Sequence, residues 1–356
     1  MTDLKKKLLD AQDGFVWHDV RRAPFEIYGL YRDEEDTDPR YRRIPQALAD
    51  SVNEYTKFLG YNPAGGRIRF STDARKIAIY VHYCFFDRSN HMCFNGECGL
   101  DLYHDNGTSH TYVCTLTPNL DTSIEQKYEY TTVDTLEGRT PAGMNCYTLN
   151  MPLYAGVDDI MIGIPEGCRL EGGAKYRPEK PIVYYGSSIT QGGCASRPGC
   201  TYQAYIGRWL DIDYRNMGFS GACRGEQNMV DFLAGLEMSA FVSDYDHNAP
   251  TVEHLENTHY ALYETVRRHH PDIPYIIITR PDVWGRAAEC AERREVIYKT
   301  YLRAKELGDE RVCFIDGGTL FSGEDADNCT VDTCHPNDLG FYRMAKTIYG
   351  VLKEFF

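Results

Sequence analysis

The stretch PIVYYGSSIT, residues 181–190, decides the fold of this chain. An apolar run leads directly into Gly186 and two serines, a pattern typical of a buried strand that ends in a tight turn. From this stretch to residue 356, short apolar runs alternate with longer amphipathic ones, which indicates a parallel sheet with helices on both faces. We therefore predict an α/β domain, a three-layer α/β/α sandwich, over residues 176–356.

The elements of this domain follow from the same alternation. The predicted strands are PIVYY, IDYRNMGF, MSAFVSDY, YIIIT and VCFIDG. The predicted helices lie near residues 201–210, 225–236, 251–269, 286–308 and 336–355. Ligands of such sheets bind beyond the carboxyl ends of the strands, so the residues just after each strand are the first candidates for chemistry.

The sequence before residue 171 has a different pattern of apolar and turn-forming residues. Between about residues 15 and 170 it consists of short strand-like runs separated by Gly, Asn, Pro and Asp clusters, which predicts a β-sandwich or jelly roll. The runs are RIRFSTDA, KIAIYVHY, TYVCTLTP, KYEYTTVDT, NCYTLNMPLY and DDIMIGIP. Residues 171–180, EGGAKYRPEK, are polar and contain Gly and Pro, as a linker does. We predict two domains, residues 1–175 and 176–356.

The charge and hydropathy of the chain exclude several classes of partner. A formal net charge of -14 disfavours nucleic acid and anionic membrane surfaces. No run of about 18 apolar residues occurs, and the first residues, MTDLKKKLLDAQDG, lack the apolar stretch of a signal peptide. We expect a cytoplasmic protein, although a trimmed leader would leave the same sequence. No pattern in the sequence indicates an oligomeric state.

The cysteine pattern indicates neither a disulfide framework nor a metal site. The 13 cysteines are odd in number and scattered, which suits a reducing compartment. The pairs Cys93 with Cys98 and Cys194 with Cys200 lack the C-x2-C spacing of zinc ligands. The glycines after residue 185 lack the spacing of a phosphate-binding loop. We expect no metal and no cofactor.

Three turns after predicted strands carry side-chain or backbone polar groups that suit acyl chemistry. Ser188 follows the first strand, where a tight turn after Gly186 can hold a hydroxyl out at the sheet edge. Gly221 follows the second strand, and its backbone N–H can face a developing oxyanion. Asn248 follows the third strand and offers a side-chain NH2 as another donor, or else caps the next helix. Each turn alone is an ordinary loop.

A base for Ser188 is predicted near the C-terminal helix. In Asp332-Thr333-Cys334-His335-Pro336, the Asp332 carboxylate lies three residues before His335 and can fold over to its Nδ1, leaving Nε2 free for a serine. His247 is the competing base. A lone histidine beside an aspartate is more often a surface or capping residue, so we favour His335.

Together these residues resemble the SGNH/GDSL hydrolases. The segment GSSIT resembles the first block, with Ser188 at the nucleophile position and Ser187 where an Asp usually stands. Gly221 resembles the second-block glycine, Asn248 the third-block asparagine, and Asp332 with His335 the D-x-x-H of the last block. The third block departs from the family, because Asp246 stands where Gly is usual and Ala249 where Asp is usual.

Longer segments narrow the resemblance. SSITQGGCASRPG, NMGFSGACRGE and DTCHPNDLGF look like a GDSL-like lipase/acylhydrolase subgroup whose N-terminal domain carries a G-x-D-L-Y motif. Here that motif is Gly99-Leu100-Asp101-Leu102-Tyr103, so the resemblance extends to the first domain. It implies a flavodoxin-like sheet in the second domain.

The resemblance implies a serine esterase. Ser188 would attack an ester carbonyl, His335 would take its proton, and Asp332 would stabilise the imidazolium. The oxyanion would bind the backbone N–H groups of Ser188 and Gly221 and the Asn248 side chain. We expect short-chain acyl esters as substrates, in particular O-acetyl groups on a carbohydrate such as an acetylated oligosaccharide. Lysophospholipids and thioesters are alternatives within the same fold.

Four further residues are candidates for substrate binding. Arg197 and Arg224 lie in loops beside the first two blocks, and Asp101 and His104 lie in or beside the G-x-D-L-Y motif. Arginines in loops are also often solvated or paired, and the motif residues could serve only to pack a strand. Two other classes of protein stay open: a non-catalytic carbohydrate-binding protein, and a scaffold that assembles through its β-domain.

Overall fold

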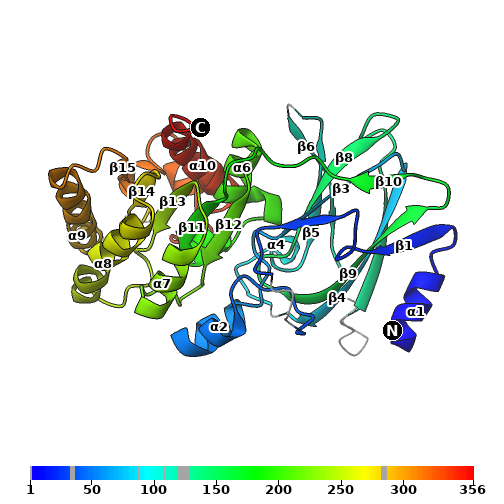
Figure 1. Ribbon diagram of the computed structural model, residues 1–356, viewed down its shortest axis with the longest axis horizontal. Helices are drawn as coiled ribbons and strands as arrows, with labels where there is room; N and C mark the ends of the chain where they lie inside the picture. Colours follow the sequence, from blue (N-terminus) through cyan, green and yellow to red (C-terminus); the bar gives the residue numbers. More distant parts are fainter. Residues whose placement is uncertain (1, 33–36, 87, 108, 119–128, 282–286) are drawn as a thin grey trace. The chain divides into compact units, whose positions relative to one another are not determined.

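The computed structural model describes residues 2–32, 37–86, 88–107, 109–118, 129–281 and 287–356, drawn in colour in Figure 1. The chain forms two compact units. The first consists of Met1–Arg43, Tyr61–Tyr176 and Ser196–Gly199. The second consists of Ile44–Gly60, Arg177–Ala195 and Cys200–Phe356. The chain therefore crosses from one unit to the other several times, whereas two continuous domains would need only one crossing.

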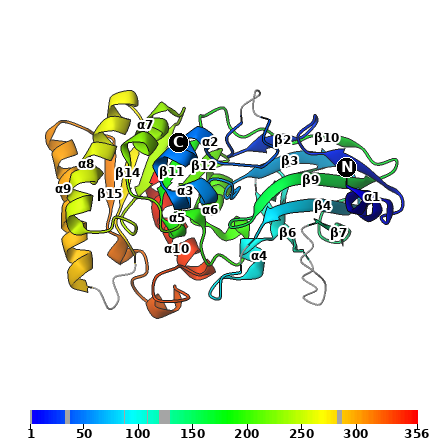
Figure 2. The same cartoon turned by 90° about the horizontal axis from the view of Figure 1, so that it is seen from below.

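The first unit is built from two antiparallel sheets (Figure 2). One has the strand order β1-β9-β4-β7, with bounds Phe15–Asp19, Gly156–Pro165, Lys76–Phe85 and Glu129–Thr135. The other has the order β10-β3-β8-β5-β6, with bounds Leu170–Gly172, Arg67–Thr72, Asn145–Asn150, Leu100–Asp105 and His110–Leu116. A short strand, β2 (Glu26–Tyr28), pairs with β3. Two helices, α1 (Asp3–Asp10) and α4 (Phe94–Glu97), accompany the sheets.

Alternating side chains of both sheets fill one hydrophobic core. Ile77, Ile79 and Val81 of β4 enter it from the first sheet, and Ile68 and Phe70 of β3 enter it from the second. This period of two residues is what a strand with one core-facing side requires. The predicted β-sandwich is confirmed.

The other face of the second sheet is buried too, and it is polar. Arg69 of β3 and Asp105 of β5 are both almost fully buried and form an ion pair there. A buried charge is tolerated when it is paired and hydrogen-bonded, so this face is stabilised by complementary side chains rather than by apolar contact.

The second unit contains a five-stranded parallel sheet in the order β12-β11-β13-β14-β15. The strands are Tyr214–Gly218, Ile182–Gly186, Ala240–Asp244, Tyr275–Ile278 and Val312–Ile315 in that order. In chain order this is 2-1-3-4-5, the flavodoxin-like arrangement, which places a topological switch point between β11 and β13. The predicted parallel sheet is confirmed.

Helices cover both faces of this sheet, as Figure 1 shows. On one face α7 (Gln227–Gly235), α8 (Val252–His269) and α9 (Ala287–Glu306) share a core with apolar side chains of the strands. On the other face Tyr184 of β11 contacts Tyr202 of α6 (Tyr202–Leu210), and Tyr202 stacks on Phe341 of α10 (Asp338–Leu352). No helix in the described ranges is long and apolar enough to cross a membrane.

Two short helices that the sequence analysis assigned to the first domain belong to the second unit. They are α2 (Gln46–Val52) and α3 (Glu54–Leu59). Leu48, Ala49 and Val52 of α2 and Leu59 of α3 lie in or against the core of the parallel-sheet unit. Asn53, between the two helices, caps α3 by accepting from the Thr56 N–H at 2.9 Å. Its side-chain amide donates to Glu226 Oε1 at 2.7 Å and to the Ala222 carbonyl at 3.2 Å.

We expect Asn53→Ala to lower the free energy of unfolding by about 1–2 kcal/mol, because it removes a helix cap and two tertiary hydrogen bonds. Asn53→Ser keeps an oxygen that can cap α3 but loses both donors, so its loss should be smaller. Urea denaturation monitored by far-UV circular dichroism measures both changes. An alanine variant as stable as the wild type would contradict this account of how the segment is held.

Candidate active site

The predicted nucleophile lies directly after β11, an interior strand of the parallel sheet. Strand β11 ends at Gly186, and Ser188 begins the short helix α5 (Ser188–Gln191). Ser187 caps this helix, since its hydroxyl accepts from the Ile189 N–H at 3.2 Å. A side chain at position 186 would come within 2.1 Å of the Thr190 hydroxyl, so only glycine lets the chain turn here.

A buried network of polar side chains holds the turn that carries Ser188. The Thr190 hydroxyl donates to Asp244 Oδ2 at 2.9 Å, and Asp244 is the last residue of β13. The Thr190 carbonyl accepts from the side-chain amides of Gln203, at 2.6 Å, and Asn216, at 2.8 Å. These contacts join the turn to the neighbouring strands and to α6, so the backbone that carries Ser188 is held on a rigid frame.

The structure brings Ser188, His335 and Asp332 into one hydrogen-bonded chain. Ser188 Oγ lies 2.8 Å from His335 Nε2, and His335 Nδ1 lies 2.7 Å from Asp332 Oδ2. Because the carboxylate accepts the proton on Nδ1, Nε2 is left as the acceptor that faces the serine hydroxyl. This geometry can activate a serine for attack on a carbonyl carbon.

His335 and Asp332 belong to one tight turn before α10. Asp332 Oδ1 accepts from the backbone N–H groups of His335, at 2.7 Å, and Cys334, at 3.1 Å, while Thr333 adopts a φ of +69°. Partial burial opposes ionisation of Asp332, but the hydrogen bonds from His335 outweigh it and hold the pKa of the carboxyl below its usual value. The Asp332 carboxylate is therefore charged at neutral pH.

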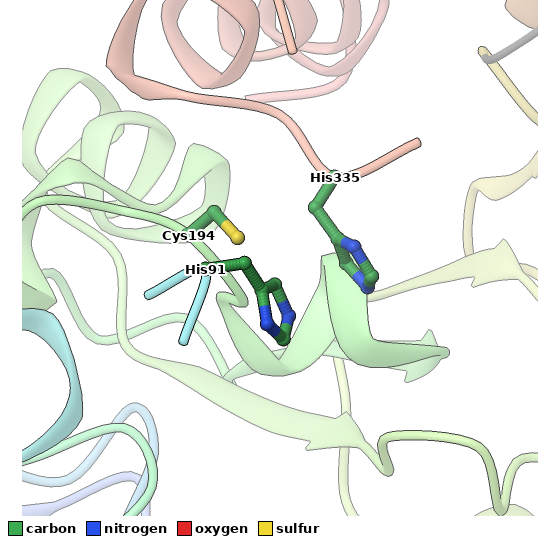
Figure 3. A group of neighbouring side chains, drawn as sticks. All are labelled: His91, Cys194 and His335. Atoms are coloured by element: carbon green, nitrogen blue, oxygen red, sulfur yellow. The ribbon is translucent and has the colours of Figure 1, made fainter. Parts of the chain in front are cut away.

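The surroundings of the imidazole are partly closed. Figure 3 shows the His335 ring projecting from the segment that leads into α10, together with the Cys194 thiol. The Cys194 sulfur lies within 4.8 Å of a His335 ring nitrogen, and Cys194 is buried with a backbone φ of +71°. The His335 side chain keeps 21% of its surface exposed, so the imidazole can be reached from solvent.

Two predicted oxyanion donors lie on adjoining loops. Gly221 has a φ of +69° in the loop after β12, and within the described residues its N–H donates no hydrogen bond. Asn248 Oδ1 accepts from the Cys223 N–H at 3.3 Å. This contact occupies the oxygen of the amide and leaves its NH2 group, which has no acceptor in the described part of the chain, as a donor.

His247, the competing base, is not the histidine that contacts Ser188. It is half-buried, and its Nδ1 lies 3.3 Å from Arg280 Nη2 and 3.9 Å from the Cys334 sulfur. Burial, with a contribution from the positive charge of Arg280, lowers the pKa of His247 to about 3. A histidine that stays neutral at ordinary pH beside an arginine is a packed polar group rather than a proton carrier.

Asp101 and Arg197, both predicted to bind substrate, are bonded to each other within the first unit. Asp101 is fully buried and its Oδ2 accepts from Arg197 Nη1 at 3.0 Å and from the Gly199 N–H at 2.9 Å. Its Oδ1 accepts from the Asn150 amide at 2.7 Å. Both carboxylate oxygens are thus bonded to protein donors, which favours a role in holding residues 196–199.

The other two candidates for substrate binding also have protein neighbours. His104 is buried, and its ring lies 5.9 Å from that of Tyr147 between ring centres. Arg224 reaches back within its own loop, where Nη2 donates to the Gly221 carbonyl at 3.3 Å. Arg224 therefore lies beside the predicted oxyanion donor Gly221, whereas His104 packs inside the β-sandwich.

The sequence analysis missed two arginines that surround the third turn. Arg293 of α9 forms a buried ion pair with Asp246, with Nε 2.7 Å from Oδ1, and the backbone N–H of Arg280 donates to Asp246 Oδ2 at 2.9 Å. The only signal in the sequence was Asp246 itself, because a carboxylate at a position expected to be buried requires a cationic partner.

Two family models match the chain, one in each half. Residues 179–353 match the GDSL-like Lipase/Acylhydrolase family, and residues 15–170 match GxDLY, the N-terminus of Esterase_SGNH_hydro-type. The chain is therefore a carboxylic ester hydrolase of the SGNH kind. It belongs to the GDSL-like lipase/acylhydrolase family, with a GxDLY domain before the hydrolase domain, and the predicted resemblance is confirmed.

Solved structures with the same fold extend over nearly the whole chain. A protein from Bacteroides ovatus ATCC 8483 described as a GDSL-like lipase is 25% identical, with a TM-score of 0.83 and coverage of 96% of this chain and 98% of that one. The salicylyl-acyltransferase SsfX3 from a tetracycline biosynthetic pathway is 17% identical, with a TM-score of 0.76 and the same coverage. A family two carbohydrate esterase from Clostridium thermocellum, solved with cellohexaose, is 14% identical, with a TM-score of 0.59 and coverage of 82% and 92%. The comparison with curated proteins gave no match.

The lowered pKa of His247 predicts an acid-dependent loss of stability. The unfolded chain protonates this histidine below about pH 6.5, whereas the folded chain does so only near pH 3. Stability from the neutral side chain is therefore complete above pH 6.5 and falls as the pH drops towards 3. Between pH 7 and 5 we expect wild type to lose about 2 kcal/mol more than His247→Asn.

Urea titrations of both chains at pH 8, 7, 6 and 5 measure this difference. Between pH 8 and 7 the two chains should respond equally, which serves as the control. Equal losses between pH 7 and 5 would show that His247 is charged in the folded protein.

Proposed function

We propose that the protein hydrolyses short-chain acyl esters through an acyl-enzyme on Ser188. The observation that carries the proposal is the continuous hydrogen-bonded chain from Ser188 Oγ through His335 to Asp332, at 2.8 and 2.7 Å. Such a chain positions an acceptor for the serine proton and a carboxylate for the imidazolium, which is what nucleophilic attack by a hydroxyl needs.

In the first half of the reaction, Ser188 Oγ attacks the ester carbonyl carbon while its proton passes to His335 Nε2. The carbonyl oxygen becomes an anion that accepts from the Ser188 and Gly221 N–H groups and from the Asn248 amide. When the tetrahedral intermediate collapses, the bond to the alcohol oxygen breaks and His335 returns the proton to that oxygen.

In the second half, water enters and His335 takes one of its protons. The hydroxide attacks the acyl carbon, the bond to Ser188 breaks, and the serine recovers its proton from His335. Asp332 stays ionised throughout and stabilises the imidazolium in both halves. The products are the free alcohol and the carboxylic acid.

We further propose that the acyl group is acetate and that the alcohol is a hydroxyl of a carbohydrate. The support is the shared fold: the family two carbohydrate esterase from Clostridium thermocellum combines the same architecture with a bound cellohexaose. A lipid ester as substrate and a non-catalytic carbohydrate-binding role are the other outcomes of the substrate experiment below.

Hydrolysis of p-nitrophenyl acetate by wild type, Ser188→Ala and Ser187→Ala tests the nucleophile. Ser188→Ala should lose at least about 1000-fold in kcat, because it removes the attacking atom. Ser187→Ala loses only a helix-capping hydroxyl and should keep most of its turnover at a temperature where it is folded. Equal turnover by wild type and Ser188→Ala would overturn the proposed mechanism.

Release of acetate from acetylated xylo- and cello-oligosaccharides, beside p-nitrophenyl butyrate and octanoate, tests the substrate. We expect kcat/KM to fall with chain length and acetylated sugars to be deacetylated. A preference for octanoate would favour a lipid ester. Binding of oligosaccharide without turnover of any ester would favour the carbohydrate-binding alternative.

A further inference from the structure

Asp246 stands at a position where the family usually carries glycine, and its carboxylate is fully buried. A buried carboxylate costs several kcal/mol unless cationic and hydrogen-bonding partners surround it. In this chain both oxygens have such partners, because Oδ1 accepts from Arg293 Nε and Oδ2 accepts from the Arg280 N–H. The departure from the family pattern is therefore matched by the Arg293 guanidinium and by one main-chain N–H elsewhere in the second unit.

Arg293 does more than neutralise this carboxylate. Its Nη2 donates to the Ala249 carbonyl at 3.0 Å and also to the Asp246 carbonyl. Asp246 and Ala249 enclose the turn that carries Asn248, so one guanidinium bonds to the main chain on both sides of that residue. Arg293 is only 3% exposed, so water does not weaken these contacts.

The Asn248 side chain is held from the other direction. Its Oδ1 accepts from the Cys223 N–H at 3.3 Å, which orients the amide plane. The direction of the NH2 group then depends on two contacts: Cys223 holds the amide oxygen, and Arg293 holds the backbone from which the side chain projects. Moving that backbone would rotate the donor away from a developing oxyanion.

We propose that Arg293 is a positioning residue that fixes the 246–249 turn so that the Asn248 amide points as an oxyanion donor. The inference rests on the proposed function, since it gives Arg293 a role only if Asn248 stabilises an oxyanion. An oxyanion donor acts mainly in the transition state, so loss of its alignment should lower kcat rather than raise KM.

Arginine suits this role and lysine does not. The planar guanidinium presents several N–H groups in a fixed fork, and here the fork serves a carboxylate and two carbonyls at once. A lysine at this position keeps the positive charge beside Asp246 but offers a single ammonium on a flexible stem. Arg293→Lys therefore separates the charge of the side chain from its geometry.

The test is a double-mutant cycle on kcat for p-nitrophenyl acetate with wild type, Arg293→Lys, Asn248→Ala and the double variant. We expect Asn248→Ala to lower kcat by about 100-fold or more. Arg293→Lys should lower kcat by about 10- to 100-fold with KM changed by less than about twofold, since small misplacements cost this much. In the Asn248→Ala background the same lysine should lower kcat by less than about twofold.

Arg267→Lys is the matched control. Arg267 pairs with Asp309 through Nε at 2.9 Å and bonds to backbone carbonyls, including that of Ile273 at 2.7 Å, but it contacts none of the active-site residues described above. It should lose thermal stability as Arg293→Lys does and keep the wild-type kcat. A general loosening of the fold would instead lower kcat in both variants.

If Arg293→Lys does not fold, the neutral pair Asp246→Asn with Arg293→Met replaces it, because removing both charges leaves no uncompensated buried ion. The same cycle with Asn248→Ala then applies. An equal fold-loss with and without Asn248 overturns the inference while Ser188-dependent turnover leaves the proposed function intact. Wild type without Ser188-dependent turnover overturns the proposed function, and the inference with it.

Discussion

The pairing of β11 with a parallel strand on each edge is the constraint on which the hydrolase unit depends. Gly186, the last residue of β11, lies in register with Gly218 on one side and Asp244 on the other. Three strands therefore end at the same level, and each is followed by a loop at the same edge of the sheet. The Phe219 N–H donates to the Gly186 carbonyl at 2.9 Å, which continues the ladder into the loop of Gly221. The three predicted blocks meet here because parallel strands share a direction.

Local patterns in the sequence predicted most of the second unit. Its five strands are short, apolar and bounded by turn residues, so their positions could be read without tertiary information. The contact between Asp332 and His335 was predictable for the same reason, because the two residues are three positions apart and the contact is local. The β-sandwich was predictable as a class, although the predicted runs did not include strands β1, β2, β5 and β10.

The remainder depends on contacts between residues far apart in the chain. Helices α2 and α3 lie within an otherwise β-rich stretch, and only their packing assigns them to the second unit. The partner of Asp246 lies 47 residues away on α9, and no periodicity connects the two. Likewise, the sequence places Arg69 in a predicted strand, but only the sheet shows that its charge meets that of Asp105 in a buried layer.

The turn of residues 332–335 joins Asp332 and His335 in one small unit, and His335 is separated from Ser188 by 147 positions in the sequence. A contact of such long range forms only after the intervening strands and helices have taken their places, because closing the loop earlier orders much chain for little gain. During synthesis the serine leaves the ribosome long before its histidine does. Until His335 has been synthesised and the last helix has docked, Ser188 therefore lacks the imidazole that contacts it in the folded chain.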